Sequence, residues 1–226
     1  MFGEPGVATF DFERLREVLY TAVLSDTLDQ AGYMRQAMRP FVRPLDEAMV
    51  LVGRARTGLF APVHHVPEGE NFYELEIALI DDLQPGEIAV LACNGPTERV
   101  APWGELLSTA ARMRGAAGCV TDGLVRDVRQ IRQMGFPVFH GGIGPLDSMG
   151  RGRMIAIDVP VECAGVSVES GDLLFGDVDG VVAIPKKIEE EVLEAAFAKV
   201  TGENTSREEL LRGLKLADVY AKYGVL

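Results

Sequence analysis

Long apolar runs and an excess of positive charge are both missing from this sequence. No stretch of roughly 18 apolar residues could cross a bilayer as a helix, so we expect no membrane span. Lysine and arginine total 22 against 34 aspartate and glutamate, a formal net charge of -12. Such a surface repels both a phosphate backbone and anionic lipid. We therefore expect no nucleic-acid partner and no membrane partner.

Cysteine, secretion signals and nucleotide motifs are also scarce or absent. The three cysteines, Cys93, Cys119 and Cys163, are widely spaced and form no C-x-x-C pair, which favours small apolar side chains in a core. The first residues hold Gly, Pro and acids without a basic and then apolar region, so a cytoplasmic location is expected. No G-x-G-x-x-G follows a strand, which argues against a dinucleotide enzyme or a methyltransferase.

The hydrophobic periodicity that is present indicates an α/β architecture. Residues 11–31 have helical spacing, with Ser25 as a candidate cap of a second short helix that Gly32 ends. Strand-like and helix-like segments then alternate: "MVLVGRARTG", "NFYELEIALIDDL", "EIAVLAC", "ELLSTAARMRG", "GCVTDG", "RDVRQIRQMG" and "VFH". This order predicts parallel strands joined by helices.

The C-terminal half changes character. Residues 153–185 hold four or five short strands separated by turns too close together for helices, including an Asp-Gly turn in "GDVDGVV". Residues 186–200 predict an amphipathic helix, and Ser206 with Glu209 predicts the start of another. We interpret residues 1–200 as one domain with N-terminal helices and residues 201–226 as a helical tail that packs on a neighbouring subunit or on its own domain.

Two helix starts carry the candidate functional residues. Arg126 and Asp127 follow a short buried strand, where free backbone N–H groups and the helix dipole attract anions. Arg126 offers a planar fork for a carboxylate and Asp127 a hard oxygen ligand for Mg²⁺. A helix-start Asp beside a solvated Arg is the plain structural alternative. Gly104–Leu107 begin the preceding helix, where the N–H groups of Glu105, Leu106 and Leu107 form a candidate anion cradle. Successive helix starts of an α/β layer lie at the same edge of the sheet, so we expect these two to converge on one pocket.

These residues resemble a known family signature. Twenty residues separate Glu105 from Arg126-Asp127, which is similar to the acid-x20-Arg-Asp motif of the RraA-like family. That family includes the regulator of ribonuclease activity A and the divalent-metal 4-hydroxy-4-methyl-2-oxoglutarate/4-carboxy-4-hydroxy-2-oxoadipate aldolases. Family-like blocks extend over nearly the whole chain: "SDTLDQAG", "LQPGEIAVL", "GCVTDGLVRDV", "GFPVFHGG", "PVECAGVSVESGDLLFGDVDGVVAIP" and "KYGVL". One departure is "VESGD", where relatives commonly have Pro before the Gly.

The resemblance implies a swivelling β/β/α sandwich that assembles as a homotrimer or a dimer of trimers. It also implies a metal-dependent (class II) lyase, an aldolase or oxaloacetate decarboxylase. Asp127 would hold Mg²⁺ or Mn²⁺, Arg126 would bind a small 2-oxo acid, and Glu105 would be the acidic catalytic residue. The backbone of Gly104, Glu105, Leu106 and Leu107 would cradle the substrate. Cleavage of the C–C bond next to a pyruvyl group would leave a pyruvate enolate that the metal stabilises.

Two alternatives stay open at this point. Some family members bind a ribonuclease without catalysis, and an acidic surface suits a basic partner. An enzyme of the same logic could also take another keto acid, with "VHHVPEGENFYELE" shaping its pocket. The sequence leaves open the physiological substrate, the metal, trimer against hexamer, and whether Glu203 reaches a neighbour's site.

Overall fold

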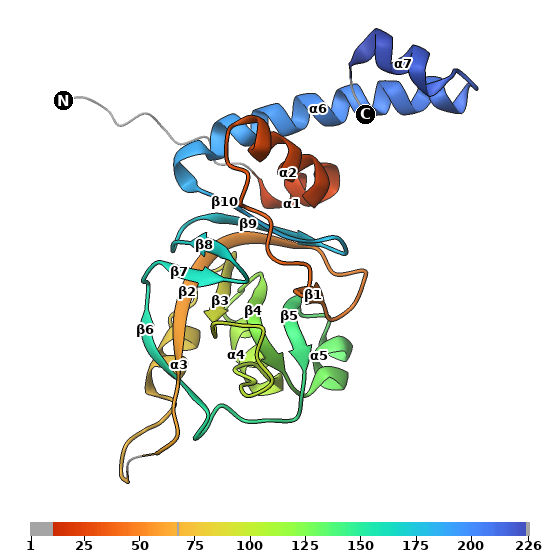
Figure 1. Cartoon of the computed structure of the whole chain (residues 1–226). Coiled ribbons are helices and arrows are strands. Elements are labelled where there is room, and N and C mark those ends of the chain that lie inside the picture. Colours follow the sequence, from red (N-terminus) through yellow and green to blue (C-terminus); the bar gives the residue numbers. More distant parts are fainter. Residues whose placement is uncertain (1–10, 67, 225–226) are drawn as a thin grey trace, which may run out of the picture.

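One twisted, mixed sheet organises the protein, whose computed structural model describes residues 11–66 and 68–224 (Figure 1). The strand order in this sheet is β1-β5-β4-β3-β2-β9-β10, with β6 also paired to β2. Strands β2, β3, β4 and β5 run parallel to one another, and the pairs with β1, β6, β9 and β10 are antiparallel. The bounds are Arg43–Pro44 (β1), Leu51–Pro62 (β2), Glu87–Ala92 (β3), Gly118–Val125 (β4), Val138–Ile143 (β5), Gly152–Ile157 (β6), Leu173–Asp177 (β9) and Gly180–Ile184 (β10).

The two edges of the sheet approach each other. The segment before β1 pairs with β10, where Met38 N–H donates to the Val181 carbonyl over 2.9 Å. Strand β1 itself pairs with β5. The sheet is therefore nearly closed, and β7 (Val161–Cys163) with β8 (Val166–Val168) forms a separate two-stranded piece. The predicted α/β class is confirmed.

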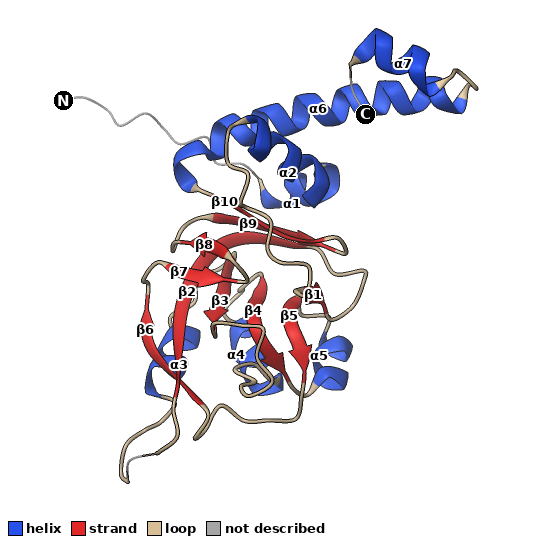
Figure 2. Ribbon diagram, in the orientation of Figure 1, coloured by secondary structure: helices blue, strands red, loops and turns tan. Residues whose placement is uncertain are grey.

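Three helices connect the parallel strands: α3 (Glu74–Asp81), α4 (Glu105–Met113) and α5 (Val128–Met134). Figure 2 shows them on the outer side of the sheet, away from the N-terminal helices. Because each helix joins two adjacent parallel strands, the start of each lies at the carboxyl edge of the sheet. This edge holds the candidate site.

Helices α1 (Phe12–Val18), α2 (Thr21–Gln30) and α6 (Glu189–Leu211) cover β9 and β10 on the opposite side (Figure 1). Their apolar side chains, among them Leu24 and Leu193, form a second core with Phe175. The short 3-10 helix η1 (Lys186–Ile188) leads into α6, and α7 (Leu216–Tyr223) packs back on its far end. The molecule thus has two apolar cores, one on each side of its sheet.

Two predicted helix caps are wrong. Ser25 lies inside α2, because the chain breaks between α1 and α2 at Leu19 and Tyr20 instead. Ser206 lies inside α6 and is only 6% exposed. Helix α6 continues across residue 200, where the boundary of the tail was expected, since its buried stripe extends from Val192 through Ser206. Packing of that stripe overrides the low helix propensity of Gly202.

Candidate functional site

The two helix starts that carry the signature are held together by backbone hydrogen bonding. Trp103, just before α4, forms a parallel bridge with Val125 at the end of β4. The Arg126 N–H then donates to the Trp103 carbonyl over 3.0 Å. The predicted convergence of the two helix starts is therefore present in the structure.

Asp127 serves the neighbouring helix, not its own. It occupies the N-cap position of α5 with φ 58°, a left-handed conformation that Asp tolerates better than most residues, and it makes no side-chain cap bond there. Its Oδ2 instead accepts a hydrogen bond from the Glu105 N–H over 3.1 Å. One N–H of the expected cradle is thus already occupied. The N–H groups of Leu106 and Leu107 have no acceptor among the described residues.

The Arg126 guanidinium lies between two carboxylates and is too far from each of them for a hydrogen bond. Its Nε is 3.9 Å from Asp127 Oδ2, and its Nη2 is 3.7 Å from Asp147 Oδ1. The side chain is 40% exposed, and its guanidinium makes no hydrogen bond within the described part of the chain. The donor fork is available to a ligand carboxylate.

A cavity of about 170 Å³ adjoins these groups. At a liquid share of about 30 Å³ per water, it holds roughly five or six waters, which suits a molecule of the size of pyruvate. Its lining contains predicted site residues together with other polar and apolar residues. The lining residues are Tyr73, Glu76, Ile77, Ala101, Pro102, Trp103, Gly104, Leu106, Leu107, Arg126, Asp127, Asp147 and Ser148. Glu105 is not in this lining. Its carboxylate accepts a hydrogen bond from Thr109 Oγ1 over 2.7 Å.

The lining also contains Tyr73, Glu76, Asp147 and Ser148, four polar residues that the signature does not include. The Tyr73 hydroxyl donates to Asp147 over 2.7 Å. Burial and this hydrogen bond raise the pKa of Tyr73 to about 12. Although burial opposes it, the bond from Tyr73 and the charge of Arg126 keep the pKa of Asp147 below its usual range. In the sequence, the segment "NFYELE" was part of a stretch predicted to shape the pocket, and no sequence pattern predicted a role for Asp147.

Glu76 is a further lining residue to which the sequence assigned no role. It lies in the first turn of α3 and is only 8% exposed. Burial, and then the negative charge of Asp147, raise the pKa of Glu76 to about 7, against the opposing effect of Arg126. Two carboxyl groups in one small cavity therefore have pKa values pushed in opposite directions, a pattern found where acid and base roles are divided.

Side-chain contacts fix the start of α4, and the Asp127 carboxylate lies close to it. Trp103 stacks on Phe136 with ring centroids 6.2 Å apart, and its Nε1 donates to Ser108 Oγ over 2.8 Å. Ser108 in turn donates to the Gly104 carbonyl. A Cβ on Gly104 would lie 2.7 Å from Asp127 Oδ2, so this position has room only for glycine if Asp127 keeps its place.

A hydrated divalent cation fits the donor set of this site. Asp127 is 42% exposed on its side chain, and its Oδ1 accepts no hydrogen bond from the described residues. Within residues 11–66 and 68–224, no group of three or more His, Cys, Asp and Glu side chains could enclose a metal. Mg²⁺ commonly binds through one or two carboxylates and completes its shell with waters and substrate oxygens. Asp127 is suited to that kind of binding.

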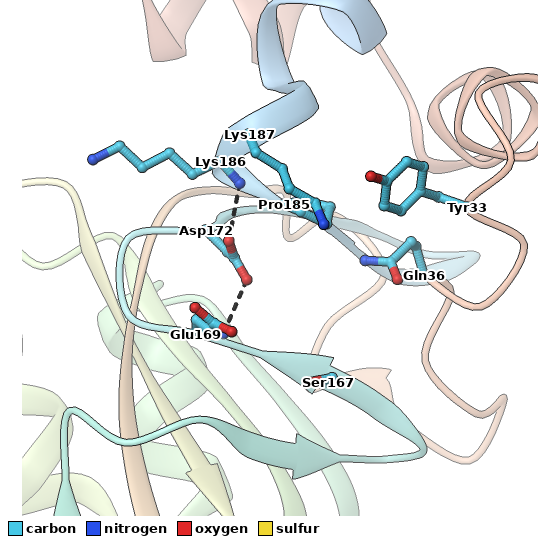
Figure 3. A pocket seen from close by; sticks show the side chains of 8 residues that line it. All are labelled: Tyr33, Gln36, Ser167, Glu169, Asp172, Pro185, Lys186 and Lys187. Carbon is cyan, nitrogen blue, oxygen red and sulfur yellow. Dashed lines mark hydrogen bonds between the residues drawn. The ribbon is translucent and has the colours of Figure 1, made fainter.

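A larger cavity lies elsewhere, between β8, the end of β10 and the segment after α2 (Figure 3). Its volume is about 490 Å³. The central carboxylate, Asp172, accepts from the backbone N–H groups of Glu169 and Lys186, so it fixes two turns. The Lys187 ammonium lies 5.4 Å from the centre of the Tyr33 ring. Figure 3 shows the Lys186 side chain directed away from Asp172.

The remaining candidates have structural partners. His64 Nδ1 lies 2.8 Å from an Arg99 nitrogen at an exposed position. Glu203 accepts from Tyr20 and pairs with Lys199 in its own chain. Cys119 and Cys163 are buried, Cys93 is half-buried, and all three are free thiols. Asp177, before the Asp-Gly turn, accepts from Thr21. Among the described helices, none has the length and apolarity that crossing a membrane requires.

Fold and site together define an α/β protein that presents an arginine fork and a carboxylate to a small cavity. The chain belongs to the RraA-like family, because the family model described as Aldolase/RraA matches residues 21–183. A protein of Halalkalibacterium halodurans, provisionally named a 4-hydroxy-4-methyl-2-oxoglutarate aldolase, is 34% identical over 194 residues, 85% of each chain.

Solved structures agree with this family assignment. A Streptomyces coelicolor protein, described as an unusual member of the RNase ES inhibitor RraA protein family, superposes with a TM-score of 0.75 and 28% identity. The match covers 92% of this chain and 99% of that one. An uncharacterized protein from Pseudomonas syringae pv. tomato gives a TM-score of 0.79 at 26% identity, over 92% and 95% of the two chains. The RraA-type fold expected from the resemblance is confirmed.

Proposed function

We propose that the protein is a divalent-metal-dependent lyase that cleaves the C–C bond next to a pyruvyl group. Candidate reactions are the retro-aldol cleavage of a 4-hydroxy-2-oxo acid, such as 4-hydroxy-4-methyl-2-oxoglutarate, and the decarboxylation of oxaloacetate. The observation that carries the proposal is the meeting of Arg126, Asp127 and the start of α4 at one cavity of about 170 Å³. The aldolase names of relatives support it.

Each residue has a distinct task in this scheme. Arg126, whose guanidinium is free of hydrogen bonds to the described residues, grips the substrate carboxylate and holds the 2-oxo group in place. The N–H groups of Leu106 and Leu107 offer two further donors to the same end of the substrate. Asp127 holds the cation, which supplies Lewis-acid polarisation of the 2-oxo group when bound. Its bond to the Glu105 N–H fixes the carboxylate in place.

Glu105 has a less direct role in this proposal. Its backbone orients Asp127, whereas its side chain points along α4 to Thr109. We therefore assign the Glu105 carboxylate to the rim of the site, where it can receive protons that leave the substrate.

A pyruvate-release assay tests the function. The purified protein is incubated with a panel of 4-hydroxy-2-oxo acids and with oxaloacetate, with and without Mg²⁺ or Mn²⁺. We expect release with at least one substrate, loss after treatment with EDTA, and recovery on adding the metal back, since a cation held by few protein ligands exchanges readily. Full turnover after exhaustive chelation would refute the metal-dependent reaction.

A second candidate function is non-catalytic binding to a ribonuclease. It is favoured by the likeness to the Streptomyces coelicolor protein of the RNase ES inhibitor RraA family, and the net charge of -12 suits a basic partner. A protein that cleaves no substrate in the panel, yet binds and inhibits a ribonuclease, would support this alternative.

A further inference from the structure

The Glu76 carboxyl is buried in surroundings that lower the stability of the fold, and no structural contact compensates for this within the described residues. It is 8% exposed and makes no hydrogen bond or salt bridge with the residues that the structure describes. Buried carboxyl groups are ordinarily paired, because desolvation of a charged or polar group is expensive. Glu76 nevertheless lines the cavity that Arg126 and Asp127 share.

The surroundings of Glu76 favour its protonated form. The charged or titratable groups that face it are Asp147 from the loop after β5, Arg126 from the end of β4, and Cys93 after β3. Burial raises the pKa of the Cys93 thiol, so that group stays neutral. Tyr73, on the same segment as Glu76, is committed to Asp147 through its hydroxyl. Glu76 is thus a carboxyl of the cavity lining that can exchange a proton near neutral pH.

The proposed reaction needs such a group. When the C3–C4 bond of a 4-hydroxy-2-oxo acid breaks, its electron pair stays on the pyruvyl fragment as an enolate, and the C4 hydroxyl loses its proton as the second carbonyl forms. Carbon 3 of the enolate must then gain a proton to become the methyl group of pyruvate. Decarboxylation of oxaloacetate leaves the same enolate and has the same need.

We propose that Glu76 is a catalytic acid that delivers the proton to carbon 3 of the pyruvate enolate. This inference rests on the proposed function. The new C–H bond forms as the Glu76 O–H bond breaks, and the enolate electron pair becomes the C–H bond while the 2-oxo group is restored. The proton lost by the C4 hydroxyl leaves through Glu105 to solvent, and the resulting Glu76 carboxylate regains a proton from solvent in both reactions. Substrate and products therefore balance without any oxidant or reductant.

Arg126 and Asp127 cannot take this role. In our scheme Arg126 is committed to the substrate carboxylate, and Asp127 is committed to the Glu105 N–H and the cation. Asp147, whose pKa is lowered, stays ionised and cannot donate. It instead keeps a negative charge near Glu76, which favours the protonated acid.

Exchange of the pyruvate methyl protons isolates this step. In the reverse direction the Glu76 carboxylate removes a C3 proton from bound pyruvate, so the wild type with Mg²⁺ in D₂O should exchange that methyl group, as followed by proton NMR. Glu76→Gln keeps the size of the side chain but cannot transfer the proton. We expect exchange to fall by on the order of 10²-fold or more, the usual contribution of a general acid or base. Glu74→Gln, an exposed carboxyl in the same helical turn, is the matched control and should exchange at the wild-type rate.

The pH profiles and metal binding separate proton transfer from a merely structural role. Cleavage needs protonated Glu76 and should decline as pH rises through its pKa, whereas exchange needs the carboxylate and should decline as pH falls. Both of these pH-dependent declines should be missing in Glu76→Gln. The Mn²⁺ affinity of this variant, measured by calorimetry, should stay within about two-fold of wild type. Glu76→Asp should recover part of the exchange.

The outcomes distinguish this inference from the proposed function. If the wild type releases and exchanges pyruvate and Glu76→Gln does so equally well, the assignment of Glu76 is wrong and the lyase stands. Loss of Mn²⁺ binding together with exchange in Glu76→Gln would also overturn it, because the residue would then be a structural support. A wild type that neither releases nor exchanges pyruvate would reject both the lyase and the role of Glu76.

Discussion

Arg126 and Asp127 are adjacent in the chain, yet they serve the cavity in different ways. The guanidinium of Arg126 is partly exposed between two carboxylates, whereas one oxygen of Asp127 is tied to the start of α4. One side chain therefore supplies free donors and the other a fixed acceptor. Substitutions at the two positions should fail in different ways.

We expect Arg126→Lys to lower kcat/KM for pyruvate release by on the order of 10²-fold or more, without rescue by added Mg²⁺. Lysine keeps the charge but loses the two-pronged donor geometry.

Asp127→Asn should instead raise the Mg²⁺ concentration needed for half-maximal activity, and its activity should recover in part at high metal. Asn tolerates the left-handed backbone at this position, so the variant should fold. Kinetics at varied Mg²⁺ provide the comparison, and near wild-type behaviour of both variants would mean that the site is misplaced.

Glu76 also predicts an unusual pH dependence of stability. Its pKa of about 7 in the folded state exceeds the ordinary value of 4.5, so between these values the folded protein binds the extra proton. Its contribution therefore weakens the fold as pH rises through this window. Glu76→Gln lacks that loss, and its free energy of unfolding relative to wild type should rise by roughly 2 kcal/mol from about pH 5.5 to about pH 8.5.

Urea unfolding at the two pH values measures this difference. His140, whose pKa burial lowers to about 4, contributes a slope of opposite sign to both proteins, so its effect cancels in the comparison. A pH-independent difference would contradict the raised pKa of Glu76.

At the scale of elements, the site depends on how closely the start of α4 approaches the start of α5. Gly104 is the contact point, with an extended backbone that any residue could adopt, so its glycine is required by space alone. An added methyl would meet the Asp127 carboxylate at 2.7 Å and the Arg126 side chain at 3.2 Å. Both are flexible side-chain ends, which can move without unfolding the protein.

Gly104→Ala should therefore retain the fold and lose function. We expect activity to fall by on the order of 10²-fold, because an ångström-scale displacement of catalytic groups has effects of this size. Gly32→Ala is a demanding control, since open space surrounds its added methyl but φ is +86°. That variant should lose about 1 kcal/mol of stability and keep its activity. Melting curves and kinetics of both variants test the separation, and an active Gly104→Ala protein would contradict it.

At the scale of the whole molecule, exposed apolar side chains lie along α4 and along the α6–α7 tail. Met113 on α4 is 79% exposed and Leu106 is 78% exposed, while Leu211 at the end of α6 is 82% exposed. Large exposed apolar residues in groups mark association surfaces. Both regions are candidates for contact with other copies of the chain.

We expect a closed homo-oligomer in solution, a trimer or a pair of trimers, because such apolar surfaces are covered most simply by symmetric association. Light scattering coupled to size exclusion measures the mass directly. Met113→Glu tests the exposed face of α4, and Leu211→Glu tests the tail; the variant that lowers the mass identifies the interface. A monomer at micromolar concentration would contradict this prediction.

Local pattern and topology were enough to predict much of this protein from its sequence. Apolar runs such as "EIAVLAC" and the helical repeats between them predicted parallel strands with connecting helices, because periodicity records which side of an element is buried. The same topology predicted that Gly104 and Arg126 would meet, since successive helix starts lie at one edge of a parallel sheet. The meeting of these two helix starts could therefore be predicted without a structure.

Only the tertiary structure decided which other groups share the cavity. Glu76 and Asp147 come from a helix and a loop that carry no motif, and burial and neighbouring charge, not residue type, set their opposite pKa shifts. The bond from Glu105 N–H to Asp127 and the continuation of α6 through Ser206 also depend on contacts between segments distant in sequence or on packing of a whole helix face. Local propensity contains neither kind of information, because a side chain's solvent exposure and electrostatic field are properties of the folded chain.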